Sequence, residues 1–377
     1  MIQTVDVFCR VVDNFGDAGV CWRLSRQLVN EHHLLVHIWI DRPETLSAFV
    51  LSGSEDHALV QNGLIKIFRL HEASYQATPA DLVIETFGCD VPDEFAKRMA
   101  ERVPQSQWVN LEYLSAEDWV SGCHALPSPH PNLPITRWFF FPGFSHQTGG
   151  LLRENGLIAR RKSFQKEAMQ RLKSVNQPHP LKVSVFCYDH PLVDALFDAF
   201  EQQQKASGHI IECRVFQGPA QRRAHDWIAT HPDHATSFIF LPWLTQAQFD
   251  EELWICDFNV VRGEDSFVRA QWAGKPFLWD IYPTEDDAHL VKMAAFLKCY
   301  REGWLDHEEG RLLGNLWQPW VRRQPQDFSQ AWEGVCKVLP LLKTQAELWC
   351  DRLGNQTDLT SALLELVLIK RSDCIQG

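Results

Sequence analysis

The sequence predicts an α/β protein of two doubly wound domains, each a parallel β-sheet covered by helices. Short apolar strands alternate with helical segments along most of the 377 residues. Tight hairpin turns do not join consecutive strands, which favours parallel pairing through helical crossovers. The length also favours two domains, because a single hydrophobic core rarely grows beyond about 250–300 residues.

The first half of the chain opens with a strand at residues 4–12 and a helix at about 20–31. β-Branched and aromatic residues fill the strand, and apolar residues recur along the helix with a helical period. A short acidic loop with two glycines, DNFGDAGV, joins the two. The other elements expected here are strands at 35–40, 64–68, 82–85 and 108–111, a helix at 95–103, a proline- and aromatic-rich loop at 121–144 that ends in a strand near 138–141, and a charged helix at 151–175.

A proline-containing linker at 176–180 separates this series from a second one. The second series repeats the architecture without repeating the sequence. Its expected elements are strands at 182–187, 210–216, 236–241 and 258–261, a helix at 192–203 with further helices between the later strands, a helix at 327–349 interrupted at Pro340, and a last amphipathic helix at 359–370.

We therefore expect a first domain at 1–176, a second domain at 180–354, and a C-terminal helix at 355–377 that packs back on the first domain. Two Rossmann-like doubly wound domains that face each other across a cleft form the GT-B arrangement of nucleotide-sugar glycosyltransferases. In that arrangement the C-terminal domain holds the nucleotide diphosphate and the N-terminal domain brings the acceptor. The predicted fold class is thus α/β, GT-B.

The composition excludes several classes of protein. With 45% apolar and 22% charged residues, the chain is globular and not disordered. Its formal net charge of −12 lacks the basic footprint of a nucleic-acid-binding protein. We find no apolar run of the roughly 18 residues that a membrane span needs, and no signal peptide pattern at the N-terminus.

Cysteines and histidines give no sign of a metal site. The 11 cysteines are scattered without a CxxC pair, which is typical of reduced thiols in a cytoplasmic protein. The 16 histidines show no ligand spacing on a clear helix. We therefore expect a cytoplasmic location, no metal and no disulfide framework.

Residues 259–289 carry the densest set of chemically useful side chains. They predict a strand end, a sharp turn at 262–266, a helix at 267–273 capped by Asp265 or Ser266, and a second strand at 277–280. A helix N-terminus offers free backbone N–H groups and a partial positive charge, which suit a phosphate. The turn is therefore a candidate diphosphate site.

Polar side chains of the turn support this interpretation. Arg262 adds a planar cation and Ser266 a hydroxyl, while Glu264 and Asp265 add carboxylates. An ordinary capped turn with a surface salt bridge would give the same pattern. A second acidic turn at 282–287 favours the functional interpretation, because it also follows a strand end, where open α/β sheets bind ligands.

Three sequence blocks, in this order and spacing, resemble the EarP family of protein-arginine rhamnosyltransferases that modify bacterial translation elongation factor P. The resemblance covers essentially the whole chain. The blocks are VVDNFGDAGVCWRL at 11–24, VFCYDHP at 185–191 and LPWLTQAQFDEELWICDFNVVRGEDSFVRAQWAGKPFLWDIYPTEDDAH at 241–289.

The resemblance implies the fold and the reaction. The family is GT-B in fold, inverting and metal-independent. It transfers L-rhamnose from dTDP-β-L-rhamnose to a guanidinium nitrogen of one arginine on a loop tip of elongation factor P, with no cofactor beyond this co-substrate. The modified factor then relieves ribosomes stalled at consecutive prolines.

The resemblance also assigns acceptor binding to the acidic loop. A carboxylate can hold a guanidinium through two hydrogen bonds and accept its proton as the new C–N bond forms. Asp13 and Asp17 match family positions with this role, and Asn14 lies beside them as an acceptor contact. Asp17 is the preferred base because it lies next to the helix start, while Glu264 is a third candidate that could share the base role or fix the rhamnose. Alternatively, Asp13 and Asp17 only cap the turn and the helix.

The implied donor site combines polar and aromatic residues. Phe186 and Tyr188 would share a face at a strand end, and thymine would stack on Trp243 or Phe249. Trp243 departs from the phenylalanine that is usual in the family. Packing in the core is the alternative role for each aromatic side chain. The implied donor contacts are Phe186, Tyr188, Trp243, Phe249, Arg262, Asp265, Ser266 and Tyr282.

Two other functions compete with this one. The chain could be a GT-B glycosyltransferase with a different nucleotide-sugar donor and a saccharide or lipid-linked acceptor. Such enzymes usually carry a basic, aromatic, membrane-facing patch, whereas the acidic loop fits a cationic acceptor better. The chain could also be a non-catalytic nucleotide-sugar sensor, an interpretation against which the carboxylates Asp13, Asp17 and Glu264 speak.

Overall fold

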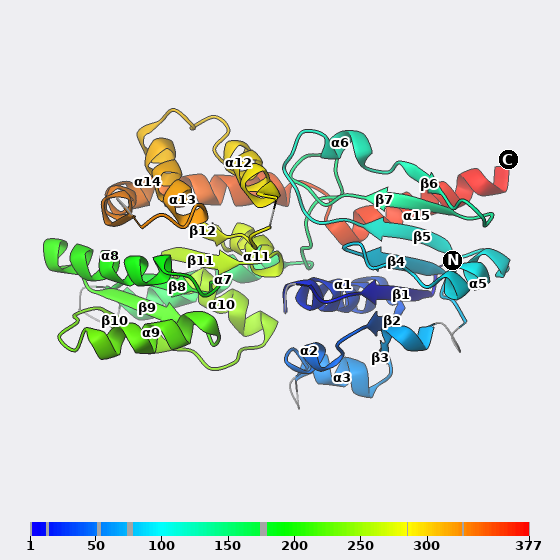
Figure 1. Cartoon of the computed structure of the whole chain (residues 1–377), viewed down its shortest axis with the longest axis horizontal. Helices are drawn as coiled ribbons and strands as arrows, with labels where there is room; N and C mark the ends of the chain where they lie inside the picture. Colours follow the sequence, from blue (N-terminus) through cyan, green and yellow to red (C-terminus); the bar gives the residue numbers. More distant parts are fainter. Residues whose placement is uncertain are drawn as a thin grey trace. The chain divides into compact units, whose positions relative to one another are not determined.

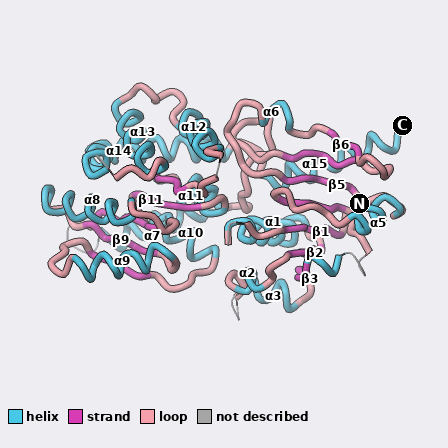
Figure 2. The backbone as a smooth tube through the Cα atoms, viewed as in Figure 1, coloured by secondary structure: helices cyan, strands magenta, loops and turns pink. Residues whose placement is uncertain are grey.

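The computed structural model describes residues 2–12, 15–50, 54–73, 78–173, 179–284, 286–325 and 328–376. The chain divides into two compact units, each with its own sheet and flanking helices (Figures 1 and 2). The first unit comprises Met1–Asn155 and Asn355–Gly377, and the second comprises Gly156–Gly354. Each unit is an α/β structure built on parallel strands.

The first unit is organised by a seven-stranded sheet of order β3-β2-β1-β4-β5-β7-β6. All neighbouring strands pair in parallel except β6, which runs antiparallel to β7 at the sheet edge. The sheet winds outward in both directions from β1 and β4, which is the point where doubly wound sheets bind ligands. Its strands are β1 Thr4–Cys9, β2 Leu35–Ile40, β3 Ile65–Arg69, β4 Leu82–Thr86, β5 Gln107–Leu111, β6 Pro127–Pro129 and β7 Thr136–Phe140.

Both faces of this sheet are covered because successive side chains of a strand point to opposite sides. Val5 and Val7 of β1 enter one buried cluster, which includes the inner residues of the first helix. Phe8 enters a second cluster on the other face. The helices of the unit are α1 Gly16–His32, α2 Glu44–Ser47, α3 Glu55–Gln61, α5 Asp93–Glu101, α6 Val120–Cys123 and α15 Leu359–Gln376.

The C-terminal helix α15 belongs to the first unit, where the sequence analysis placed it. Its residues Leu359, Leu363 and Val367 lie in the same buried cluster as the inner face of α1. The side chain of Thr360 donates to Gln27 of α1 at 2.9 Å. The first unit therefore takes part of its core from the far end of the sequence.

The second unit contains a five-stranded sheet of order β10-β9-β8-β11-β12, in which all pairs are parallel. Its strands are β8 Leu181–Val185, β9 Ile211–Val215, β10 Ser237–Phe240, β11 Phe258–Arg262 and β12 Phe277–Asp280. Its helices are α7 Leu157–Lys173, α8 Leu192–Ser207, α9 Pro219–Thr230, α10 Gln246–Ile255, α11 Asp265–Ala273, α12 Ala288–Tyr300, α13 Glu308–Val321 and α14 Phe328–Gly354.

The structure corrects the expected boundary between the two units. Helix α7 lies in the second unit and not in the first, so the division falls after Asn155 and not near residue 176. The fully buried guanidinium of Arg161 explains this, since it donates to the Ala273 carbonyl at 2.8 Å and to both oxygens of Glu347 at 2.8 and 2.6 Å. These partners lie at the end of α11 and in α14.

Several helix ends also differ from the sequence expectations. Helix α1 begins at Gly16 and not near Val20, and α7 begins only at Leu157, after the expected start at 151. Helix α14 continues through Pro340, where an interruption was expected. Leu339 and Leu342, on either side of this proline, are both buried and hold this part of the helix in the core.

The part of the chain that the structure describes contains no helix both long and apolar enough to cross a membrane.

We expect the buried ion pair between α10 and α11 to be a main support of the second unit. Arg269 donates to Asp250 at 2.9 and 2.6 Å, and the two side chains are only 1% and 3% exposed. Because Arg269→Met removes the cation from a buried carboxylate, it should lower the free energy of unfolding by about 3–5 kcal/mol, measured by urea denaturation.

Lys337→Met is the control for this substitution. It breaks the exposed Lys337–Glu333 pair, whose side chains are 69% and 52% exposed, and should change stability by less than about 1 kcal/mol. Equal effects of the two substitutions would show that the buried pair does not hold α10 against α11.

Candidate functional site

The turn between β11 and α11 forms where the sequence predicts it, but its capping differs. Gly263 takes a left-handed φ of +62°, and Glu264 occupies the N-cap position without a side-chain capping bond. Ser266 lies inside the first helical turn, where its hydroxyl accepts the Arg262 N–H at 3.0 Å and donates to the Arg262 carbonyl. The expected cap by Asp265 or Ser266 is therefore wrong, and Ser266 instead closes the turn from within.

The guanidinium of Arg262 lies against two aromatic rings. Its Cζ atom is 4.4 Å from the ring centroid of Phe186 and 5.1 Å from that of Tyr188. The ring of Tyr282 meets that of Tyr188 edge-on at 5.6 Å. The structure thus brings together four residues that the sequence analysis assigned to the donor, although they come from three separate strand ends.

Arg262 has few polar partners within the described part of the chain. Among the described residues, no carboxylate forms an ion pair with Arg262, and its one side-chain hydrogen bond is a long 3.5 Å contact to the Cys187 carbonyl. A cation over aromatic faces keeps its donors free for another partner. The arrangement therefore suits an incoming anion at the N-terminus of α11.

The expected base-stacking residues lie near the same edge of the sheet. Phe249 of α10 contacts Phe186 at a centroid distance of 5.4 Å and Phe216 at 4.5 Å. Trp243 is half-buried in the segment that follows β10. Because all five strands are parallel, their carboxyl ends meet at one edge, and these rings extend the group around Arg262.

Two carboxylates begin helix α11. Glu264 has a side chain that is 14% exposed, and its Oε2 atom lies 3.9 Å from the Lys292 amine. Asp265, the first residue of the helix, is half-buried. Tyr282, by contrast, is 45% exposed.

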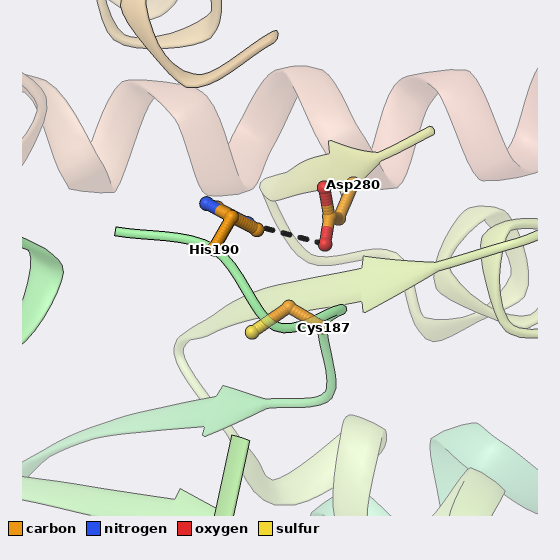
Figure 3. Close-up of side chains that lie close together, drawn as sticks. All are labelled: Cys187, His190 and Asp280. Carbon is orange, nitrogen blue, oxygen red and sulfur yellow. Dashed lines mark ion pairs between the residues drawn. The ribbon is translucent and has the colours of Figure 1, made fainter. Parts of the chain in front are cut away.

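A second polar group beside this site was not singled out in the sequence. The ligand atoms of Cys187, His190 and Asp280 all lie within 4.8 Å of one another, and all three residues are buried (Figure 3). The only signal available was that two strands end in polar residues here, at YDHP and at WD.

The chain supplies a cation to this group itself. The Arg323 guanidinium lies 2.6 Å from Asp280 Oδ1 and 2.7 Å from His190 Nε2. Burial raises the pKa of the Cys187 thiol well above its usual value. The group is thus better described as an internal ion network than as a metal cradle.

In the first unit, Asp17 lies in the first turn of α1 and is 2% exposed. Its Oδ2 atom accepts the Val12 N–H at 2.8 Å, and its Oδ1 atom lies 3.4 Å from the hydroxyl of Tyr113. One oxygen therefore closes the loop, as the alternative interpretation requires, while the other faces a polar group. Asp13 and Asn14 lie outside the described residues.

An aromatic pair supports the Tyr113 side of Asp17. The rings of Tyr113 and Phe87 stack with centroids 4.5 Å apart. Phe87 follows β4 with a left-handed φ of +55°, which is rare for a bulky residue and is found mostly where the surroundings impose it. Asp17 thus sits at the carboxyl edge of the first sheet, between the ends of β1, β4 and β5.

The chain is similar to known glycosyltransferases over nearly its full length. A family model described as "Elongation-Factor P (EF-P) rhamnosyltransferase EarP" matches residues 5–368. A protein-arginine rhamnosyltransferase of Pseudomonas putida is 43% identical over 382 residues, which cover 97% of this chain and 98% of the relative. Another from Pseudomonas aeruginosa is 38% identical over 377 residues, with 96% and 97% covered.

Solved structures give the same picture. The structure reported as the basis for EarP-mediated arginine glycosylation of translation elongation factor EF-P matches with a TM-score of 0.62 at 32% identity, and the match covers 96% of this chain and 98% of that one. MurG of Acinetobacter baumannii matches with a TM-score of 0.52 at 13% identity over 98% and 99% of the chains, a likeness of fold alone. The predicted GT-B fold is thereby confirmed.

Proposed function

Because this chain belongs to the EarP family of EF-P rhamnosyltransferases, we propose that it transfers L-rhamnose from dTDP-β-L-rhamnose to an arginine side chain of translation elongation factor P. The observation that carries the proposal is the Arg262 guanidinium, which lies over Phe186 and Tyr188 at the start of α11 without a carboxylate partner among the described residues. The acceptor is a translation factor, so we place the reaction in the cytoplasm, where it prepares the factor to rescue ribosomes stalled at consecutive prolines.

The donor site must stabilise the departing diphosphate. Arg262 provides a cation with several N–H donors, and Asp265 and Ser266, the first residues of α11, add the backbone N–H groups of a helix N-terminus. Donors already in place where negative charge develops lower the barrier most, because they need no reorganisation. The guanidinium and the helix terminus thus take the role that a divalent cation has in other glycosyltransferases, so the transfer needs no metal.

The Tyr282 hydroxyl and the aromatic rings complete the donor site. Tyr282 donates to a phosphate oxygen, while Tyr188 bounds the rhamnose side of the pocket. Phe249, which contacts Phe186, offers a face to thymine, and Trp243 after β10 is the second candidate for this stacking.

The acceptor arginine must lose a proton as it becomes a nucleophile. A guanidinium has a pKa above about 12, so a carboxylate has to accept the proton while the bond forms. The arginine nitrogen attacks the anomeric carbon from the face opposite the diphosphate, the C–O bond to the diphosphate breaks, and the configuration inverts. We assign the proton to Asp17, with Asp13 and Asn14 holding the acceptor and Glu264 orienting the rhamnose.

A mass measurement tests the whole proposal. Purified elongation factor P incubated with this protein and dTDP-β-L-rhamnose should gain the mass of one deoxyhexose, and the same factor with its loop-tip arginine replaced by lysine should gain none. A gain only with another nucleotide sugar would favour a different donor, and no transfer with any donor to a folded factor would favour the sensor.

The substitution Asp17→Asn should reduce turnover about 10²–10⁴-fold and leave the affinity for thymidine diphosphate unchanged, because it removes only proton acceptance. Asp81→Asn is the matched control, since Asp81 accepts the Gln3 N–H at 2.8 Å at the opposite end of β1. A collapse of nucleotide binding in Asp17→Asn would instead make Asp17 a donor or folding residue.

The substitution Arg262→Ala should weaken thymidine diphosphate binding about 10–100-fold in calorimetry, because it removes a charge-assisted contact to the diphosphate. Arg352→Ala is its control, since Arg352 also lies over an aromatic ring, 5.6 Å from the centroid of Trp349, but at a surface ion pair with Glu302. Unchanged affinity in Arg262→Ala would remove this arginine from the diphosphate site.

A further inference from the structure

Asp280 joins the segments that carry the donor residues. It ends β12, is 1% exposed, and accepts the Tyr188 N–H on Oδ2 at 2.6 Å. Its backbone carbonyl accepts the Gly263 N–H at 3.3 Å, and it lies opposite Arg262 in the register of β11 and β12. One residue therefore bonds both the end of β8 and the turn that opens α11.

Two basic side chains hold the Asp280 carboxylate in place. Arg323 Nη2 lies 2.6 Å from Oδ1, and His190 Nε2 lies 3.3 Å from Oδ2 (Figure 3 shows His190 and Asp280). Burial alone would raise the pKa of Asp280, but His190, Arg323 and the Tyr188 N–H outweigh it and hold the pKa below its usual value. Asp280 is therefore a fixed anion under the donor site.

The end of α13 sets the position of Arg323. Arg323 follows the C-cap residue Arg322 with a left-handed φ of +56°, a conformation that commonly ends a helix. The Gln324 N–H donates to the Pro319 carbonyl at 2.9 Å across this turn. The ring of His190, which Arg323 also contacts, is held edge-on by Trp320 at 4.8 Å.

Asp257, a second acid beside the same sheet, makes a similar set of contacts away from the donor residues. Asp257 precedes β11 and accepts the Lys182 N–H of β8 at 2.9 Å, and its other oxygen pairs with the Lys343 amine at 2.6 Å. At the amino ends of the strands, Asp257 thus accepts a backbone N–H of β8 and pairs with a cation from α14. At the carboxyl ends, Asp280 accepts the Tyr188 N–H and pairs with Arg323 in the same way. Only the pair at the carboxyl ends adjoins Tyr188 and Arg262.

We propose that Asp280, anchored by Arg323 and His190, is a positioning residue for the donor site, an inference that rests on the proposed function. By fixing the Tyr188 backbone, Asp280 sets the ring of Tyr188 against Arg262 and Tyr282. By taking Arg323 as its partner, it also leaves the guanidinium of Arg262 to the diphosphate. Loss of the anchor lets the Tyr188 ring and Arg262 move, which weakens donor binding and leaves acceptor recognition unchanged.

Calorimetry with thymidine diphosphate on the full chain tests the proposal. Asp280→Ala and Arg323→Met should each weaken nucleotide binding about 10–100-fold, while Arg323→Lys, which keeps the charge, should recover part of the loss. The matched controls Asp257→Ala and Lys343→Met should bind like the parent. Steady-state kinetics should show a raised KM for the donor and an unchanged KM for the acceptor protein.

Each outcome decides the proposal. Parent-like nucleotide binding in folded Asp280→Ala and Arg323→Met overturns it, as does an equal loss in the controls. If Asp280→Ala does not fold, the Arg323 series decides, because that side chain is 27% exposed and Arg323→Lys keeps a cation beside Asp280. A parent that does not bind thymidine diphosphate overturns the proposed function together with this inference, whereas a binding parent with unaffected variants overturns the inference alone.

Discussion

The second unit depends on how charge is balanced where β11 and β12 end side by side. Arg262 and Asp280 are opposite each other in register, and the simplest arrangement would be a salt bridge between them. The structure pairs Asp280 with Arg323 and His190 instead, and places Arg262 over two aromatic rings. The buried Asp280 carboxylate is thus paired with Arg323 and His190, while the Arg262 cation at the same edge stays available to a ligand.

The features of the fold and of the candidate site that depend on neighbouring residues could be predicted from the sequence. The alternation of strands and helices predicted both sheets, and the RGEDS turn predicted the start of α11, because these features depend on neighbouring residues. The sequence analysis assigned Phe186, Tyr188 and Arg262 to one donor site, and the structure places the Arg262 guanidinium over both rings. What local pattern could not predict is the use of the Ser266 hydroxyl, since the same residue can cap a helix or close the turn from within.

Long-range contacts account for the rest. The contact between Arg323 and His190 joins residues 133 positions apart, and no periodic pattern in the sequence predicts it. Similarly, the sequence of α7 is typical of a charged surface helix. The contacts of its buried Arg161 with Glu347 and Ala273, which lie far along the chain, place it in the second unit. Pro340 was expected to break a helix on intrinsic propensity, which tertiary packing overrides. The acidic loop was predicted as a catalytic feature, and the described part of it shows Asp17 with one oxygen already used to close the loop.

The return of α15 to the first unit has a consequence for biosynthesis. Leu359, Leu363 and Val367 complete a core whose other members lie before residue 153, so the whole of the second unit, Gly156–Gly354, is translated before that core can close. The polypeptide that emerges from the ribosome can finish its later half first and its earlier half last, which reverses the usual N-terminal-first order. Synthesis of residues 359–367, and not emergence of the early strands, is therefore the step that permits the first unit, which contains Asp17, to complete its core.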